Sequence, residues 1–282
     1  MHLTKERIII SMTSYKHRLK NIPTVLDTIY AQTLRPDLVV LNLAFDEEVP
    51  DEVQNYIAKH KIEVNRVKDT KVYKKLIPTL KKYPNDCIIT IDDDFLYPKG
   101  MIEDFWKVHI QYPDFPISGN KVFYNIYQCH CGCASLMKAD YLGNYIDYID
   151  EDVMRNCPCD DIVYTYLSNK NGHPYMRTCG LYFVNMEHFQ EGEGYSDSVG
   201  SASITNTFKY LVQRFGILEN NLDKYITNKE IEDLMEDYVA ANMELAFSKG
   251  SDYMRSSYSY RLGHFVLTPL RKLMKLFSYS ES

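Results

Sequence analysis

Residues 88–94 of this chain read Ile-Ile-Thr-Ile-Asp-Asp-Asp, so an apolar run ends abruptly in three carboxylates. The run is rich in β-branched residues, which predicts a strand buried on both faces over 87–91. Adjacent acids repel one another and are costly to desolvate, so they call for a cation. Carboxylate oxygens suit hard divalent ions, and the stretch therefore predicts a Mg²⁺ or Mn²⁺ site. The alternative interpretation is a solvated acidic turn that caps a helix beginning near Pro98.

Apolar runs and helical patterns alternate on the N-terminal side of this stretch. We predict strands over 7–12, 38–43 and 62–67 and helices over 22–32, 51–60 and 72–83. This alternation indicates an α/β domain whose mostly parallel sheet is covered on both faces. Ligands of such sheets bind beyond the carboxyl ends of the strands, so the loop 13–18 and Asp92–Asp94 are expected to share one edge. Further helices are predicted over 98–107, 160–171, 204–215 and 229–247.

The composition narrows the class of protein further. The 282 residues are 45% hydrophobic and 25% charged, which fits a globular protein and excludes disorder. The net charge of −6 argues against nucleic acid as a partner. No apolar run reaches the roughly 18 residues of a membrane span, and the N-terminus has no signal-peptide pattern. Seven cysteines, an odd number, fit reduced thiols. We therefore expect a cytoplasmic protein.

The order of these elements resembles that of the GT-A fold glycosyltransferases, in particular the family 2-like enzymes of bacterial polysaccharide assembly. The resemblance covers about residues 1–190 and depends on the opening strand followed by Thr13-Ser14-Tyr15 and on the Asp-x-Asp motif of Asp92 and Asp94. It implies a Rossmann-like, mostly parallel sheet flanked by helices, with a C-terminal helical extension. The expected divisions are a nucleotide-sugar-binding and catalytic domain (1–200), a helical extension (201–257) and a basic amphipathic segment (258–282).

The resemblance also assigns roles to single residues. Asp92 would contact the ribose or uracil side of the donor, and Asp94 would hold a metal ion on its diphosphate. Lys74 or Lys75 would reach the base or the phosphates of the donor, although lysines on the surface of a helix are commonly just solvated. The expected donor-binding residues are Thr13, Ser14, Tyr15, Arg18, Lys74, Lys75, Asp92, Asp93 and Gly132. The expected metal ligands are Asp94, Asp92 and His188, the last of which has the alternative of a plain surface histidine.

A second acidic pair, Asp160-Asp161, begins a predicted helix. By the resemblance it matches the Glu-Asp element whose last carboxylate is the general base of family 2 enzymes. A base is needed because a sugar hydroxyl is a poor nucleophile until its proton is accepted. We expect Asp161 in this role and keep Asp160, which replaces the usual Glu, as the alternative. The pair is also open to a purely structural interpretation, since acids stabilise the first turn of a helix.

Two other segments carry patterns that bear on function. The sequence Cys129-His130-Cys131-Gly132-Cys133, with Cys157-x-Cys159, contains zinc-ligand types, but its single-residue gaps are unlike the two to four of structural zinc sites. A reduced strand and loop is therefore favoured over zinc. The aperiodic, Gly-containing segment 190–200 is expected either to close over bound donor as a lid or to be an ordinary loop.

The end of the chain differs in charge from the rest. Residues 251–282 contain five basic and two acidic residues, a balance of +3 against −9 for residues 1–250. Over 260–277 the apolar and basic side chains fall on opposite faces of a helical wheel, and Pro269 interrupts the helix. This pattern predicts a helix in an anionic membrane interface. A helix docked on the protein's own core, or a dimer contact, is the alternative.

These observations predict a metal-dependent, inverting glycosyltransferase (a hexosyltransferase). It would move a sugar from a nucleotide-diphosphate donor, expected to be UDP-linked, to a glycan or lipid-linked glycan at the inner face of the cell membrane, in cell-surface polysaccharide synthesis. One rival is a haloacid-dehalogenase-type phosphatase with Asp92 as nucleophile, which the late position of the motif and Phe95 argue against. The other is a non-catalytic nucleotide- or sugar-binding protein, which would not need Asp161.

Overall fold

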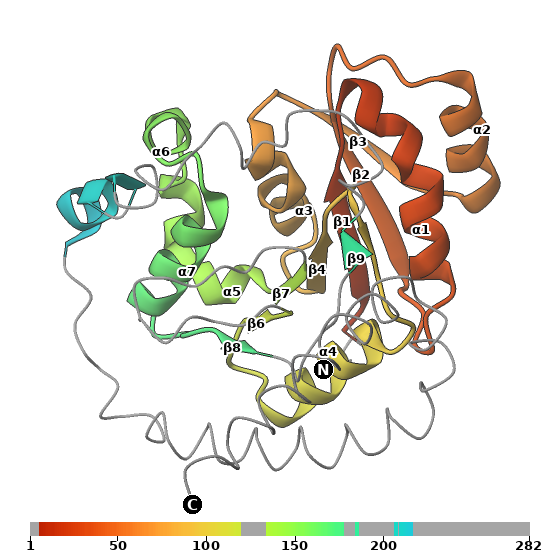
Figure 1. Ribbon diagram of the computed structural model, residues 1–282. Helices are drawn as coiled ribbons and strands as arrows, with labels where there is room; N and C mark the ends of the chain where they lie inside the picture. Colours follow the sequence, from red (N-terminus) through yellow and green to blue (C-terminus); the bar gives the residue numbers. More distant parts are fainter. Residues whose placement is uncertain (1–5, 120–133, 178–183, 186–205, 208, 217–282) are drawn as a thin grey trace, which may run out of the picture. The chain divides into compact units, whose positions relative to one another are not determined.

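A seven-stranded sheet with the order β3-β2-β1-β4-β7-β6-β8 forms the centre of the structure (Figure 1). The computed structural model describes residues 6–119, 134–177, 184–185, 206–207 and 209–216, all of which belong to the compact unit 1–221. The strands of this sheet are β1 (Ile8–Thr13), β2 (Leu38–Ala44), β3 (Glu63–Val67), β4 (Cys87–Ile91), β6 (Ile117–Ser118), β7 (Ala134–Met137) and β8 (Met176–Arg177). A separate ribbon pairs β5 (Phe95–Leu96) with β9 (Val184–Asn185).

Helices cover both faces of the parallel strands. Figure 1 shows α1 and α2 on one side of β1, β2 and β3, and α3 on the other. The α-helices are α1 (Ile22–Tyr30), α2 (Asp51–His60), α3 (Ile77–Lys82), α4 (Met101–Gln111), α5 (Ala139–Leu142), α6 (Glu151–Asn156) and α7 (Asp160–Lys170). The 3-10 helices are η1 (Lys16–Asn21), η2 (Lys71–Lys75) and η3 (Gly143–Tyr148).

The direction of the strands confirms the predicted mostly parallel sheet. β1 pairs in parallel with both β2 and β4, and β2 pairs in parallel with β3. These strands are parallel because each returns to the sheet through a helical crossover. β7 then runs antiparallel to β4 and to β6. Every residue of β4 is buried, as a strand covered on both faces requires.

Two predicted helices differ from the observed ones. The helix predicted over 72–83 is divided into η2 and α3, and Pro78, which lacks an N–H to donate, lies in the first turn of α3. The helix predicted over 98–107 begins only at Met101, after Gly100 in the N-cap position, and extends to Gln111. Residues 206–207 and 209–215 are helical, within the helix predicted over 204–215. The predictions for 190–200, 229–247 and 258–282 lie outside the described residues.

A buried network of polar side chains fixes η2 and α3 against the sheet. The Ser11 hydroxyl donates to the carbonyl of Lys75 at 2.6 Å and lies 2.6 Å from Thr79 Oγ1. Asn42 Nδ2 donates to Ser11 Oγ at 3.1 Å and to Thr79 Oγ1 at 2.9 Å. Ser11, Asn42 and Thr79 are all fully buried. The network therefore anchors the backbone of Lys75 beside the carboxyl ends of β1 and β4.

Removing the central amide of this network should destabilise the fold. Asn42→Ala leaves two buried hydroxyls without their donor, and we expect the free energy of unfolding in urea to fall by about 2–3 kcal/mol. Asn65, which is only half-buried and donates to Asn42 Oδ1 at 2.8 Å, provides the control. Asn65→Ala should cost less. Equal losses for the two variants would contradict the assigned role of Asn42.

Candidate functional site

The loop after β1 and the acidic stretch after β4 meet at one edge of the sheet. The two strands are neighbours, with Ser11 opposite Thr90, so the segments that follow them leave the sheet side by side. Ser14 Oγ donates to Asp93 Oδ2 at 2.6 Å, and Asn21 Nδ2 donates to the backbone carbonyl of Asp93 at 3.1 Å. The shared edge that the sequence predicts is therefore confirmed.

One arginine binds two of the three aspartates. Arg18, in η1, has its Nη2 atom 2.7 Å from Asp93 Oδ1 and 2.5 Å from Asp94 Oδ2. Its guanidinium also lies 5.8 Å from the centre of the Tyr15 ring. Burial nevertheless raises the pKa of Asp93 to about 6, with Arg18 opposing the shift. Burial and repulsion from Asp92 raise the pKa of Asp94 to about 7. A single guanidinium thus leaves the acids incompletely neutralised.

These raised pKa values make the acidic site a source of instability at neutral pH. The pKa of Asp94 rises from 3.8 to about 7, so the folded protein keeps a proton that the unfolded chain has lost, and its stability falls as the pH rises between these values. Asp94→Asn should therefore be more stable than the unmodified protein by about 1–2 kcal/mol at pH 8 without divalent metal. At pH 4 the difference should vanish. Urea unfolding at the two pH values measures this, and an Asn variant that is less stable at pH 8 would refute it.

The third aspartate of the stretch is paired with a lysine. Lys75 Nζ, at the end of η2, lies 2.8 Å from Asp92 Oδ1. Burial opposes the charge of Lys75, but attraction to Asp92, Asp160 and Asp161 raises its pKa well above the usual value. The neighbouring Lys74 instead makes a 2.6 Å ion pair with Asp69. Of the two lysines expected in the donor site, the structure therefore brings Lys75 to the acids.

The second acidic pair lies close enough to interact with the first. Asp160 and Asp161 form the first turn of α7, and both attract Lys75. Asp160 is buried, and its Oδ2 atom has no hydrogen-bond partner among the described residues. Burial raises the pKa of Asp160 to about 7, with repulsion from Asp161 and Asp92 adding to it and Lys75 opposing it. Asp161 is half-buried. Acids that are far apart in the sequence thus share one electrostatic site around Lys75.

The remaining predicted site residues fall into two groups. Thr13 Oγ1 donates to the carbonyl of Asn42 at 2.8 Å, and Tyr15 is half-exposed immediately before η1. Gly132 and His188 lie outside the described residues, as do the cysteines at 129–133. Cys157 is a free, buried thiol, and burial raises its pKa to about 12.

Comparison with known proteins supports the fold but not a closer relationship. The sequence matches no family model and no curated protein. It is similar in structure to the mannosyltransferase PcManGT from Pyrobaculum calidifontis, solved with GDP-Man and Mn²⁺, at 14% identity and a TM-score of 0.50, over 92% of this chain and 83% of that one. It is also similar to S. aureus TarS 1–349, solved with UDP-GlcNAc, at 12% identity and a TM-score of 0.56, over 86% of this chain and 73% of that one. The chain has a GT-A fold.

Within this GT-A fold, sequence reasoning missed two residues that hold the acidic stretch in place. The first is Asn21, which donates to the backbone carbonyl of Asp93. The second is Tyr97, whose hydroxyl accepts a hydrogen bond from the amide of Asp92 at 2.8 Å. Tyr97 is buried, and it lies just beyond β5. Neither residue belongs to a motif, so only their proximity in the structure identifies them.

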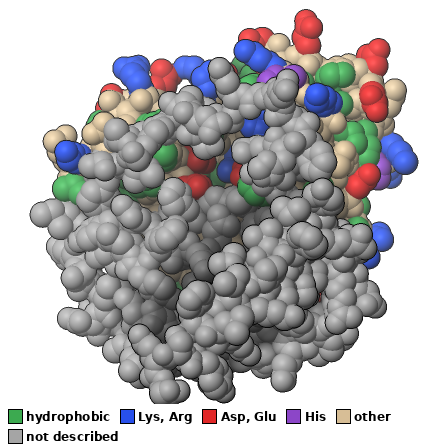
Figure 2. All heavy atoms as spheres, viewed as in Figure 1, with side chains coloured by type: hydrophobic (Ala, Val, Ile, Leu, Met, Phe, Trp, Pro, Cys, Tyr) green, Lys and Arg blue, Asp and Glu red, His purple; other side chains and the backbone are tan. Residues whose placement is uncertain are grey.

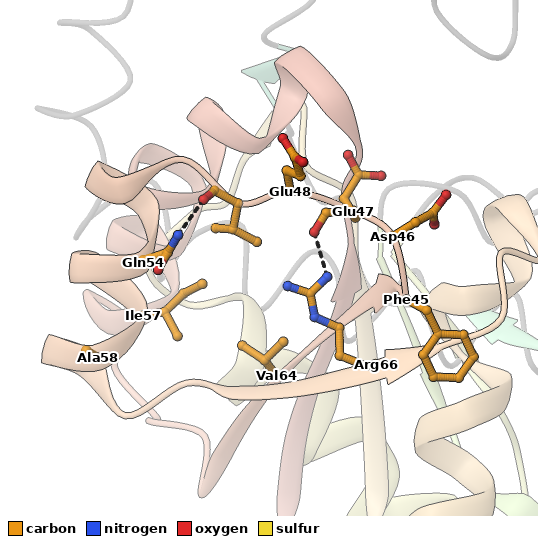
Figure 3. Close-up of a pocket in the computed structure, with 10 residues that line it drawn as sticks. Phe45, Asp46, Glu47, Glu48, Gln54, Ile57, Ala58, Val64 and Arg66 are labelled. Carbon is orange, nitrogen blue, oxygen red and sulfur yellow. Dashed lines mark hydrogen bonds between the residues drawn. The ribbon is translucent and has the colours of Figure 1, made fainter.

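A separate hollow of about 740 Å³ lies between α2, β3 and the turn after β2 (Figure 3). Its lining includes Phe45, Glu47, Ile57, Val64 and Arg66 and none of the acids of Asp92–Asp94. The Arg66 guanidinium donates to the carbonyls of Ala44 and Glu47, which fixes the turn after β2.

Figure 2 shows acidic and basic side chains next to one another on the face viewed in Figure 1.

Proposed function

We propose that this protein is a metal-dependent glycosyltransferase that transfers a sugar from a nucleoside-diphosphate donor. The observation that carries this proposal is the arrangement of Asp92–Asp94 and Asp160-Asp161 around Lys75 and Arg18, beyond the carboxyl ends of β1 and β4. In α/β sheets this edge is where ligands bind. The complexes of PcManGT with GDP-Man and Mn²⁺ and of TarS with UDP-GlcNAc support the choice of donor class and metal.

The acidic stretch has the chemistry of a divalent-metal site. Asp92 and Asp94 offer carboxylate oxygens, which Mn²⁺ and Mg²⁺ prefer, and the raised pKa of Asp94 signals incomplete neutralisation. We propose that these two residues hold the ion, with His188 as a further candidate ligand. When bound, the ion would stabilise the negative charge of the departing diphosphate. We propose that Thr13, Ser14, Tyr15, Arg18, Asp93 and Gly132 bind the donor, with Lys74 as a further candidate.

The contacts of Lys75 support a role for this residue in the proposed sugar transfer. Its ammonium lies 2.8 Å from Asp92 Oδ1 and is attracted by Asp160 and Asp161, so it interacts with both groups of acids. A fixed positive charge here keeps neighbouring carboxylates ionised, and an ionised carboxylate is what a general base requires. We propose that Lys75 orients the donor-side acids and keeps the base ready to accept a proton.

Proton removal from the acceptor is assigned to Asp161, with Asp160 as the alternative. Asp161, at the start of α7, is half-buried and therefore more open to an incoming hydroxyl than Asp160, which is buried. The acceptor oxygen would bond to the anomeric carbon as the bond from that carbon to the diphosphate oxygen breaks, and the hydroxyl proton would pass to the carboxylate. Attack in line with the leaving group inverts the configuration at this carbon.

The proposal is tested by screening nucleotide sugars for binding and slow hydrolysis. With Mn²⁺ present, at least one UDP- or GDP-linked sugar should release its nucleotide, and a chelator should stop the reaction. Donor hydrolysis is the appropriate measurement because it needs no knowledge of the acceptor. Failure of every nucleotide sugar to bind, with or without metal, would overturn the proposed activity.

We further propose that the acceptor is a glycan or lipid-linked glycan and that the enzyme works at the inner face of the cell membrane. The described residues include no helix long and apolar enough to cross a membrane. The basic, amphipathic pattern of residues 258–282, which lie outside the described residues, supports peripheral binding to an anionic surface.

Deleting residues 258–282 should release the protein from anionic vesicles. The segment contains four basic residues, and each contributes about 1 kcal/mol near such a surface, so partitioning should fall at least about tenfold. Vesicle sedimentation measures this, with neutral vesicles as the control. Unchanged partitioning would show that the segment docks elsewhere.

A further inference from the structure

A second cluster of metal-ligating side chains lies at the opposite edge of the sheet from the aspartates. The Nε2 atom of His109, in α4, lies 2.9 Å from Glu6 Oε2 and 3.3 Å from Cys87 Sγ. All three ligand atoms fall within 4.8 Å of one another. Cys87 is the first residue of β4, whereas Asp92 follows its last, so the length of the strand separates the cluster from the proposed active site.

The hydrogen bonds of His109 determine which of its ring nitrogens carries a proton and which has a free lone pair. Tyr141 Oη donates its proton to the carbonyl of Pro113 at 2.7 Å, so it can only accept from His109 Nδ1, which lies 3.4 Å away. Nδ1 therefore carries a proton. In the neutral ring, Nε2 then presents its lone pair to Glu6 and Cys87.

This arrangement requires a positive charge between the ligand atoms. A nitrogen lone pair and a carboxylate oxygen that face each other at 2.9 Å in a buried space repel, unless a proton or a metal ion lies between them. A proton on Nε2 would form one good hydrogen bond, to Glu6, and the Cys87 thiol would be a second, weaker donor to the same carboxylate. A metal ion can bond the nitrogen, the oxygen and the sulfur together.

The chemistry and support of the three ligands favour zinc. Imidazole, thiolate and carboxylate are the ligand types that Zn²⁺ takes, and because a structural zinc site almost always has four ligands, a water would supply the fourth here. Cys87 and His109 are buried. Lys138 Nζ lies 2.5 Å from Glu6 Oε1, which leaves Oε2 for the metal, and Tyr141 orients the imidazole. Outer partners of this kind are typical of metal ligands.

We propose that Glu6, Cys87 and His109 form a structural Zn²⁺ site. Binding replaces the thiol proton of Cys87, which is released to solvent, by a sulfur–zinc bond. The ion would join three segments that are far apart in the chain: the residues before β1, the start of β4, and α4. Its effect is therefore expected on the stability of the fold rather than on sugar transfer, and it does not depend on the proposed activity.

Cobalt provides a direct test, because a thiolate bonded to Co²⁺ gives a near-ultraviolet charge-transfer band that oxygen ligands do not. Full-length protein, stripped of metal under reducing conditions, is titrated with Co²⁺. We expect the band to saturate at one equivalent and to disappear when Zn²⁺ is added. Absence of the band in the unmodified protein would overturn the proposal.

Matched variants locate the site. Cys87→Ser and His109→Gln should lose the band and the Zn²⁺-dependent rise in melting temperature. Cys157→Ser, which alters another buried thiol, should keep both. A triple variant with serine at 129, 131 and 133 should also keep both, and loss of the band there would place the metal elsewhere. Circular dichroism checks that each variant folds. If Cys87→Ser is unfolded, His109→Gln decides the question, and a band that persists in a folded variant of either residue overturns the proposal.

Discussion

Replacing Asp94 with alanine is expected to lower the affinity for a nucleoside diphosphate about 100-fold in the presence of Mn²⁺, since loss of even an outer partner of a metal ligand costs 10- to 100-fold. The physical reason is that burial and repulsion from Asp92 disfavour the charged form of Asp94 and raise its pKa to about 7, so a cation bound there would stabilise the carboxylate that holds it. Isothermal titration with UDP and GDP, with and without Mn²⁺, measures the effect. In the unmodified protein the metal should strengthen binding, and in the variant it should make little difference.

Asp104→Ala is the matched control for this experiment. Asp104, in α4, is also a partly buried acid, and burial raises its pKa, but no contact with Arg18 or Lys75 connects it to the proposed metal site. Its replacement should leave Mn²⁺-dependent binding intact. If Asp94→Ala binds nucleotide as the unmodified protein does, under both conditions, Asp94 has no role in metal binding.

Replacing Asp161 with asparagine is expected to lower the rate of sugar transfer by about 10²- to 10⁴-fold, the range that a general base contributes. Asparagine has nearly the shape of aspartate but cannot take up a proton, so donor binding should change little. The two measurements are therefore made together, transfer by product formation and donor affinity by titration. A drop in both would indicate a structural role for Asp161 instead.

The neighbouring residue separates the two candidates for the base. Asp160→Asn removes a buried carboxylate next to Lys75 and should lower transfer less than Asp161→Asn does. If Asp161→Asn retains full turnover while Asp160→Asn loses it, the base is Asp160. If both variants keep full turnover, the proton is accepted elsewhere.

The parallel half of the sheet was predictable because hydrophobic pattern and burial agree there. β1, β2 and β4 are short, mainly apolar runs and β3 lies between two predicted helices, so the predicted and observed bounds of these four strands differ by at most one residue at either end. The short strands β5, β6, β8 and β9 have two residues each, which is too few for a periodic signal. Their pairing depends on contacts between distant segments.

The proposed active site was predictable only in part, because some of its contacts depend on how distant segments pack together. That the segment after Thr13 meets Asp92–Asp94 follows from parallel strands, whose carboxyl ends share an edge. Which lysine faces the acids did not follow, because Lys74 and Lys75 are adjacent and the turn of η2 directs one toward Asp69 and the other toward Asp92. The cluster of Glu6, Cys87 and His109 has no recognisable spacing at all, since three separate segments of the chain supply it.

The central claim is that a divalent cation binds at the edge of the sheet beyond β4. It is tested most directly by a crystal structure of the full-length protein with Mn²⁺ and a nucleoside diphosphate, using the anomalous scattering of manganese to locate the ion. We expect an anomalous peak between the carboxylate of Asp94 and the diphosphate. Nucleotide bound there with no such peak, or a manganese ion bound only elsewhere, would contradict the account.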